Sequence, residues 1–322
     1  MLFRPEELKN YEICYRDSKY SLYHDESIKD GYWHGMLLIP NNKRNGFFTI
    51  IKSIRNRHGY LEKISFKDIN GPGQKFNLAE HLLQVCLGFL RSKPNKEILP
   101  VLNWDDESGN NDGSPYHCLD PELMGAKFIL FRVKDDHRNM TYFRDKVCKV
   151  ETTLRMGITG GLHFLGSSDK KIHIEKIHLD GYQQNNRHAD VSRIVDRIYG
   201  LRDYCSFGPR ESLIDDRSSN PKSDDHQALI DCEFLMLTDL LIGSFRVALS
   251  GFEKNNYKKR LSLHAEMILE RMSQGRHRMG NSRWANSFWL SECELTDGQW
   301  AFHNIELIKP DNRNQLPLDF II

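Results

Sequence analysis

A long apolar helix is the sequence feature that most constrains the fold. Residues 228–249, which include the string CEFLMLTDLLIGSF, carry few polar side chains and predict a helix that packs against the core. Asp239 lies inside that string, so its carboxylate is expected to face the core too. A buried carboxylate needs a partner, a shifted pKa or a metal ion, because leaving it unpaired is costly. Asp239 is therefore the first candidate functional residue.

The rest of the chain predicts an α/β fold, because segments with strand character are interspersed with segments of helical periodicity. Strands are expected at residues 18–24, 31–40, 60–66, 127–133, 171–179 and 212–215. Helices are expected at residues 47–56, 77–91, 140–165 and 191–199. The first two strands are expected to pair as a hairpin across a polar, acidic break.

The character of the chain changes after Gly251. A basic helix is expected at residues 257–272, and a β-hairpin around Asp297 and Gly298. With 322 residues, two domains or one large domain with an extension are natural. We expect a main domain at residues 1–250 and a C-terminal helix-plus-hairpin appendage at residues 251–322.

Composition and charge exclude several classes of protein. The chain has 45 basic and 44 acidic residues and a formal net charge of +1, so no global field would hold it on nucleic acid or on an anionic membrane. No apolar run approaches the roughly 18 residues that a membrane-spanning helix needs, and the start of the chain lacks the pattern of a secretory signal. The seven cysteines include no C-x-x-C pair, which argues against a disulfide framework and a thiolate zinc site. A cytoplasmic protein without a membrane partner is expected.

Carboxylates stand out at four places, where strands end or where a helix is otherwise apolar. These are Asp25 with Glu26, Glu62, Asp180 and Asp239. Mg²⁺ and Mn²⁺ fit such a set best, because these hard cations prefer carboxylate oxygens and water. Two such ions, held by acids from separate segments, can promote hydrolysis of a phosphodiester. For any single acid, an ordinary solvent-facing charge remains the alternative.

Other motifs do not predict a site. The string WDDESG at residues 104–109 repeats part of the first acidic motif, but it lies in a polar loop and fails the spacing of a calcium loop. The string HIEKIH at residues 173–178 lacks the order of a zinc metalloprotease. The chain contains neither a phosphate-binding loop of the G-x-x-x-x-G-K-[ST] type nor a G-x-S-x-G nucleophile elbow.

Five strings, in this order, carry a resemblance to a known family. They are Y-H-D-E-S at residues 23–27, a G-x-x-x-G-M-L-L-I-P string at 31–40, L-E-K-I-S-F at 61–66, K-I-H-L-D-G at 176–181 and L-M-L-T-D-L-L-I-G-S at 235–244. Over about residues 18–250 the chain resembles the bacterial family catalogued as domain of unknown function 3800, which is similar to the ribonuclease H-like superfamily. The family usually has glycine after the serine of the first motif, where this chain has Ile28.

The resemblance implies a ribonuclease H-like fold, in which helices flank a mixed central sheet. It also implies that Asp25 and Glu26 are metal ligands on the first strand and that Asp239 is the carboxylate of the late helix. Asp180 matches an interior acid, and Glu62 matches the acid of a short motif. The implied catalytic set is Asp25, Glu26, Asp180 and Asp239, with Glu62 as an added ligand, and the implied cofactors are two Mg²⁺ or Mn²⁺ ions.

Basic and aromatic residues could contact nucleic acid. Lys63 or His24 could touch the scissile phosphate. Basic side chains of the C-terminal part could cup a phosphate backbone while an aromatic ring stacks on a base; these residues are Lys254, Lys258, Lys259, Arg260, Arg276, Arg278, Arg283 and Trp284. An exposed basic helix and loop is an equally good interpretation of them.

Two functions are therefore carried forward. The first is a metal-dependent nuclease that cuts RNA, DNA or a hybrid, with antiviral defence or mobile elements in bacteria as the setting that the family suggests. The second is a catalytically silent or conditionally activated module that binds nucleic acid or a partner protein on the same fold. The sequence does not give an oligomeric state.

Overall fold

An antiparallel hairpin of β1 (Lys19–Ser27) and β2 (Tyr32–Pro40) lies in the middle of the sheet and confirms the expected pairing. Its turn includes Asp30 and Gly31, both with positive φ, which are 58° and 117°. β1 is longer than the sequence suggested, so Asp25 and Glu26 lie on the strand itself. Asp25 pairs with Gly35 of β2 in the register.

The structure is a computed structural model that describes residues 19–90, 125–134, 143–144, 146–165, 172–180, 191–201, 205–216, 222–251, 253–275 and 287–305. Its strands form one mixed sheet in the order β5-β4-β1-β2-β3-β7-β8, with β6 also paired to β4. The pairs β1–β4, β3–β7, β4–β5 and β4–β6 are parallel, whereas the others are antiparallel. The remaining strands are β3 (Lys127–Val133), β4 (Ile172–Leu179), β5 (Cys205–Phe207), β6 (Ile214–Asp215), β7 (Phe288–Thr296) and β8 (Gln299–Asn304).

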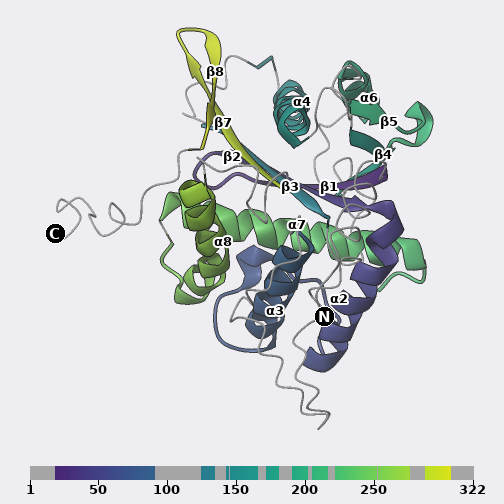
Figure 1. Cartoon of the computed structure of the whole chain (residues 1–322), viewed down its shortest axis with the longest axis vertical. Coiled ribbons are helices and arrows are strands. Elements are labelled where there is room, and N and C mark those ends of the chain that lie inside the picture. Colours follow the sequence, from purple (N-terminus) through teal and green to yellow (C-terminus); the bar gives the residue numbers. More distant parts are fainter. Residues whose placement is uncertain are drawn as a thin grey trace, which may run out of the picture.

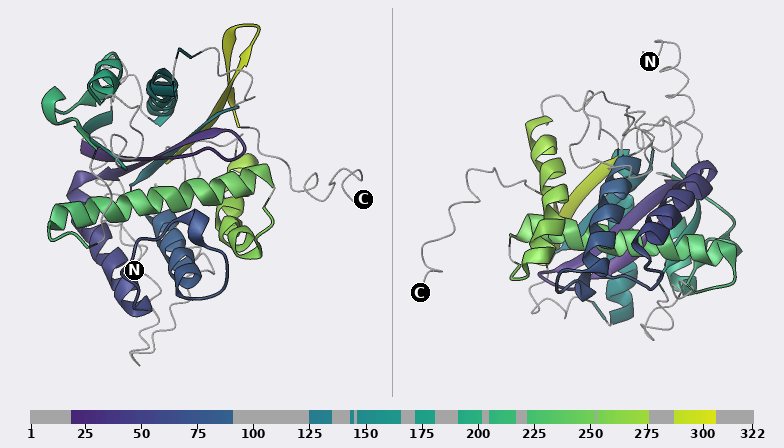
Figure 2. Two further views of the ribbon diagram at one scale, coloured as in Figure 1. Left: turned by 180° about the vertical axis from the view of Figure 1, so that it is seen from behind. Right: turned by 90° about the horizontal axis from the view of Figure 1, so that it is seen from below.

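Helices cover both faces of this sheet, which confirms a mixed α/β fold (Figures 1 and 2). On one face lie α4 (Lys146–Leu165) and α6 (Val191–Tyr199), which pack on a core that includes Leu22 and Ile177. The other face is crossed by α7 (His226–Ser250). Outside α7 lie α2 (Arg44–His58), α3 (Gln74–Phe89) and α8 (Asn256–Gly275).

The position of α7 between the sheet and the outer helices explains its apolar sequence. Every residue from Ile230 to Ala248 is buried except Asp239, which is partly exposed. The close approach of α7 to the sheet depends on Gly35, because a Cβ atom there would lie 2.1 Å from Cγ1 of Ile242. The predicted helix is thus confirmed, and Asp239 marks the one break in its buried stretch.

The strand that we expected at residues 60–66 is wrong. This segment is irregular and ends in the short 3₁₀ helix η2 (Phe66–Asp68). Side chains, not a neighbouring strand, satisfy its backbone: the Arg55 Nη1 group donates to the carbonyls of Tyr60 and Glu62 at 3.1 and 3.0 Å. Sulfur of Met236 accepts from the N–H of Ile64 at 3.4 Å. These three backbone groups are therefore paired although the segment is not part of the sheet.

The C-terminal hairpin is also placed differently from the expected appendage. Its turn at Asp297 and Gly298 is confirmed, but β7 pairs in parallel with β3 and continues the central sheet. Phe288 of β7 belongs to the main hydrophobic core. α8 packs against α7, where the hydroxyl of Ser244 donates to the carbonyl of Leu261. The hairpin and helix are thus integrated with the preceding fold.

Smaller differences concern the edge beside β4. The expected strand at residues 212–215 is reduced to the two residues of β6, preceded by a 3₁₀ helix at Arg210–Ser212, and β5 was not expected. Among the described residues, no helix is long and apolar enough to cross a membrane.

Candidate functional site

β1 and β4 deliver two of the predicted carboxylates to one edge of the sheet. β1 runs parallel to β4, so the C-terminal ends of both strands lie at the same end of the sheet. Side chains alternate along a strand, which puts Asp25 on the same face of β1 as Tyr23, the face that α7 covers. Asp180 directly follows β4. Both carboxylates therefore reach the space beneath α7.

Asp239 completes this space from the helix. Its Oδ2 atom accepts a 2.6 Å hydrogen bond from the N–H of Phe66, and the Ser65 side chain also bonds to the carboxylate. The approach of Phe66 depends on Gly243, since a Cβ atom there would lie 2.1 Å from Cγ of the Phe66 ring. One turn of α7 thus supplies both the carboxylate and the room for the segment that binds it.

A pocket of about 560 Å³ opens where these elements meet. Four of the acids that the sequence singled out line it, namely Asp25, Glu26, Asp180 and Asp239. Basic side chains line it as well, and these are Lys29, Lys63, Lys67, Arg246 and Lys258. We call it the acidic pocket. Acids from three separate segments therefore line one pocket.

The carboxylates of the acidic pocket repel one another. The pKa of Asp25 is raised well above its usual value, first by burial and then by the negative charge of Asp239, while the Glu26 N–H, which donates to Oδ1 at 2.8 Å, opposes the shift. Burial also raises the pKa of Asp239, against the hydrogen bond from Phe66. A divalent cation would relieve this repulsion, since it favours the charged form of both groups.

Glu26 has a partner of its own. The hydroxyl of Tyr32, across the hairpin, donates to its Oε2 atom. This contact orients the second carboxylate of the first motif at the edge of the acidic pocket.

Glu62 is not brought to the acidic pocket. Its side chain is 59% exposed and pairs with Lys222 at 2.7 Å, and it is not among the lining residues. The sequence placed Glu62 on a strand, whereas the irregular course of residues 60–65 directs it to solvent. The neighbouring Lys63 does line the pocket and pairs with Asp180 at 3.0 Å.

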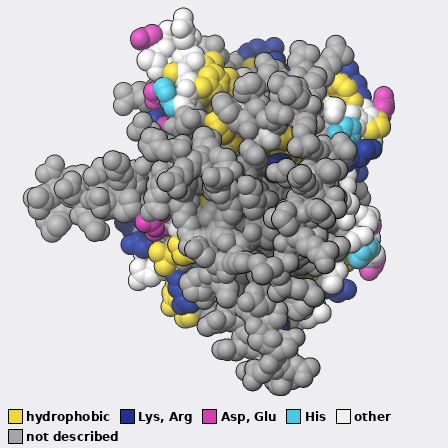
Figure 3. Space-filling view, in the orientation of Figure 1, with side chains coloured by type: hydrophobic (Ala, Val, Ile, Leu, Met, Phe, Trp, Pro, Cys, Tyr) yellow, Lys and Arg dark blue, Asp and Glu magenta, His cyan; other side chains and the backbone are white. Residues whose placement is uncertain are grey.

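The other predicted contacts to nucleic acid divide into three groups. Lys258 lines the acidic pocket, where its Nζ donates to the carbonyl of Lys67 at 2.9 Å. Lys259 is exposed on α8 and is not among the lining residues. Arg276, Arg278, Arg283 and Trp284 lie outside the described residues, as does the loop string at residues 104–109. Described charges of both signs alternate around the margin of the face in Figure 3.

The prediction that His24 could contact the scissile phosphate is wrong. Its side chain is fully buried on the opposite face of the sheet, where Nε2 lies 2.8 Å from Nδ1 of His34. The other nitrogen of His34 lies 2.8 Å from the hydroxyl of Thr153 in α4. His24 thus faces the core beneath α4, because it neighbours Asp25 on an alternating strand.

The sequence did not reveal Arg55, which positions the wall of the acidic pocket. Its guanidinium is buried and pairs with Glu233 of α7 at 2.6 Å, besides its bonds to the backbone at residues 60 and 62. Glu233, like Asp239, is an acid within the apolar helix, and that pattern could have identified it. Nothing in the local sequence distinguishes Arg55 from the other arginines of α2.

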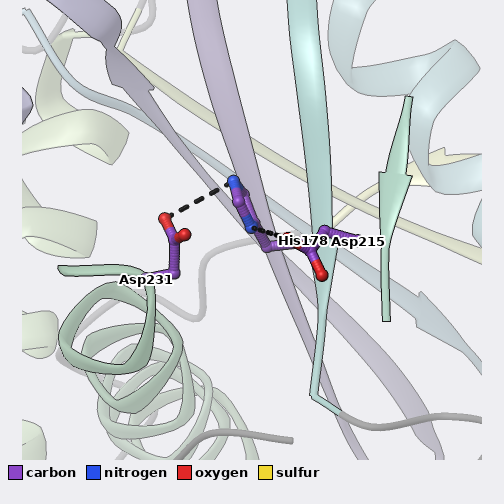
Figure 4. A group of neighbouring side chains, drawn as sticks. All are labelled: His178, Asp215 and Asp231. Carbon is purple, nitrogen blue, oxygen red and sulfur yellow. Dashed lines mark ion pairs between the residues drawn. The ribbon is translucent and has the colours of Figure 1, made fainter. Parts of the chain in front are cut away.

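A second polar cluster lies under the same helix and joins His178, Asp215 and Asp231 (Figure 4). One ligand atom from each lies within 4.8 Å of the others, close enough to hold a metal ion, and it is the one group of three such residues among those described. The two carboxylates face opposite nitrogens of the imidazole: Nε2 lies 3.5 Å from Asp231 and Nδ1 lies 4.0 Å from Asp215.

Cations of the chain already balance this cluster. Asp231 accepts from the guanidinium of Arg44 and, at 2.8 Å, from the hydroxyl of Tyr23. Asp215 pairs with Lys176 at 3.3 Å. Each carboxylate therefore has its own positive partner. In the acidic pocket, by contrast, neither Asp25 nor Asp239 forms an ion pair with a described residue.

The balance of charges therefore favours the acidic pocket over the cluster at His178 as the place where a cation binds. At Asp231 an ion would compete with Arg44, whereas at Asp25 and Asp239 it would replace repulsion by attraction. The two sites lie on one face of α7, eight residues apart, which is about 12 Å at the rise of an α-helix.

No protein-family model matches the chain, and neither a curated protein nor a solved structure matches it.

Proposed function

We propose that the chain is a Mg²⁺- or Mn²⁺-dependent nuclease that hydrolyses phosphodiester bonds in RNA, DNA or a hybrid. The observation that carries the proposal is the convergence of Asp25, Asp180 and Asp239 in one pocket that basic side chains also line. Acids of this kind suit a hard cation, and the lysines suit the phosphates of a substrate.

The donor set fits the proposed cofactor. Asp25 and Asp239 would hold the metal, with Glu26 and Asp180 at the margins of the same space. These are oxygen ligands of the kind that a hard cation prefers. Burial raises the pKa of both Asp25 and Asp239, and for Asp25 the charge of Asp239 adds to the shift, so a bound cation would favour the charged form of both groups. When bound, such a cation supplies Lewis acidity for the activation of water and for the stabilisation of charge on the phosphate.

The chain's own residues bind and orient. The N–H of Phe66 and the hydroxyl of Ser65 fix the carboxylate of Asp239, and Tyr32 fixes that of Glu26. The hydrogen bond from Nζ of Lys258 to the carbonyl of Lys67 holds these two residues together at the wall of the pocket. Their ammonium groups would attract the phosphates on either side of the scissile bond.

The resemblance to the ribonuclease H-like superfamily supports the same proposal. It implied a first-strand carboxylate, an interior acid and a carboxylate on a late helix within a mixed sheet. β1, the end of β4 and α7 supply acids to one pocket in that way. Glu62 is the member of the implied set that this support does not include.

A binding module is the second candidate. The observation that favours it is the spacing of the acids, because no three of those described in the acidic pocket have ligand atoms within 4.8 Å of one another. Such a module would use the lysines of the pocket to bind nucleic acid and would need no ion.

Cleavage assays with matched variants test the two candidates. Purified protein is incubated with single- and double-stranded RNA, DNA and a hybrid, in Mg²⁺, in Mn²⁺ and in EDTA. We expect metal-dependent cleavage that Asp25→Asn and Asp239→Asn each lower at least about 100-fold. Asp68→Asn, which changes another acid of the pocket wall, is the control and should retain activity. Binding without cleavage, unchanged in Asp25→Asn, would establish the binding module instead.

A further inference from the structure

Lys63 occupies one side of the acidic pocket. Its Nζ atom lies 3.0 Å from Oδ2 of Asp180, and the two side chains are 45% and 23% exposed. The ammonium also acts on Asp239, whose pKa its charge lowers. A positive charge of the chain therefore acts on the carboxylates from both β4 and α7.

The backbone on both sides of Lys63 is anchored. The carbonyl of Glu62 accepts from Arg55 at 3.0 Å, and the N–H of Ile64 donates to the sulfur of Met236 at 3.4 Å. The anchors are buried residues of α2 and α7. The backbone that carries the Lys63 side chain is thus held in place, and its ammonium group stays within reach of Asp180.

The acids of the pocket divide into two groups by their partners. Asp180 has a cation of the chain, whereas Asp25 and Asp239 have hydrogen bonds from N–H groups and no ion pair with a described residue. A divalent ion at Asp180 would have to displace the ammonium or lie beside it against Coulomb repulsion. An ion between Asp25 and Asp239 would displace no ion-paired ammonium, although the charges of Lys63 and Lys67 also act on Asp239.

We propose that the acidic pocket takes one divalent ion, at Asp25 and Asp239, and that the ammonium of Lys63 on Asp180 supplies the second positive charge. This inference rests on the proposed nuclease function and refines it, because a two-ion site would need Asp180 as a ligand. Lys63 then serves as a phosphate-binding cation at a position that a second metal would otherwise fill, and Asp180 serves to position it.

Counting bound Mn²⁺ tests the inference without an activity assay. Isothermal titration calorimetry and the electron paramagnetic resonance signal of free Mn²⁺ give the number of ions for the full chain and its variants. We expect one ion in the wild type, one in Asp180→Asn with affinity changed less than about tenfold, and none in Asp239→Asn. Lys63→Met should bind two ions, since Asp180 loses its ammonium. Lys67→Met, another lysine of the pocket wall, should bind one.

The outcomes separate this inference from the proposed function. Two ions in the wild type that fall to one in Asp180→Asn would overturn the inference and leave the nuclease proposal intact. One ion in Lys63→Met, as in the wild type, would overturn the role given to Lys63. No Mn²⁺ binding by the wild type, together with no metal-dependent cleavage, would overturn both.

Discussion

The main-chain N–H of Phe66 donates a 2.6 Å hydrogen bond to the carboxylate of Asp239, a residue 173 positions further along the chain. The bond joins the start of η2, which directly follows the irregular segment at residues 60–65, to the helix that crosses the sheet. It fixes the one partly exposed position in the buried stretch of α7. The orientation of the candidate metal ligand therefore depends on a short 3₁₀ helix and on the irregular segment that leads into it.

Gly243→Ala should disturb this bond, because the added methyl group would lie 2.1 Å from the ring of Phe66. Overpacking of this kind costs about 1–3 kcal/mol of unfolding free energy. We also expect weaker Mn²⁺ binding, since Phe66 must move away from Asp239. Urea denaturation and calorimetry measure the two effects. Gly160→Ala is the matched control, because the nearest atom to its Cβ would be 3.7 Å away and a helical alanine is favoured.

Arg55→Met should destabilise the protein by about 3–5 kcal/mol, because it leaves the buried carboxylate of Glu233 without its cation. The double variant Arg55→Met/Glu233→Met should recover part of that loss, since no buried charge remains. Denaturation in urea checks both. Arg260→Met is the control, because the Arg260 side chain is 59% exposed and solvent screens its pair with Glu80, which should be worth about 1 kcal/mol. Equal costs for Arg55→Met and Arg260→Met would contradict the positioning role of Arg55.

Asp25→Asn should stabilise the metal-free protein near neutral pH. Burial and neighbouring acids raise the pKa of Asp25 in the folded state, so the folded protein holds this proton more tightly than the unfolded chain. The resulting stability is present at low pH and is lost as the pH rises through the folded pKa. The charge therefore costs stability near pH 7, and asparagine removes it, with about 2–4 °C in Tm for each kcal/mol relieved.

Thermal melts in EDTA across the acid to neutral range check this prediction. The advantage of Asp25→Asn should shrink as the pH falls below the raised pKa of Asp25, and it should be gone below about pH 4, where an unperturbed carboxylate is itself protonated. Added Mn²⁺ should raise the Tm of the wild type and not that of the variant, by binding linkage. A variant that is less stable than the wild type at every pH would contradict the proposed repulsion.

Arg44→Gln should convert the second cluster into a metal site. The wild-type guanidinium compensates Asp231, so Zn²⁺ should not bind at His178, Asp215 and Asp231 in the wild type. Without Arg44 the carboxylate is left with the hydroxyl of Tyr23 and the imidazole, and a divalent cation would restore the balance. Zinc titration of the variant, with Arg44→Gln/His178→Gln as control, checks this. Zinc binding at His178 in the wild type would contradict the argument from charge balance.

Part of this architecture could be predicted because its cause is local. The apolar run of α7 and the strand character of residues 18–24 and 31–40 predicted those elements, and the acids at Asp25, Asp180 and Asp239 followed from their placement at strand ends and within the helix. Each of these patterns reflects burial of one face or of a whole element, and such burial leaves a recognisable pattern of apolar residues in the sequence.

The remaining features of the fold depend on contacts with residues far away in the sequence, and such contacts leave no local pattern. The pattern of residues 60–66 predicts a strand, but Arg55 and Met236, not a neighbouring strand, bond to backbone groups of this segment. β7 reads as part of a separate hairpin, but its pairing with β3 is a property of the assembled sheet. Glu62 was predicted at the metal site because its segment was expected to be a strand, whereas the irregular course of residues 60–65 directs its side chain to solvent.

Two adjacent lysines of α8 provide the most direct test of the basic wall. Lys258 lines the acidic pocket, whereas Lys259 is exposed and is not among the lining residues. Each phosphate contact that a protein loses lowers the slope of log K against log salt by about 0.7–0.9. Lys258→Met should therefore reduce the salt slope of nucleic-acid binding by about one contact, while Lys259→Met should leave the slope unchanged. Fluorescence anisotropy with a labelled oligonucleotide over a salt series measures both. Equal slopes for the two variants would place the bound backbone away from the acidic pocket, because the charge of both variants is the same.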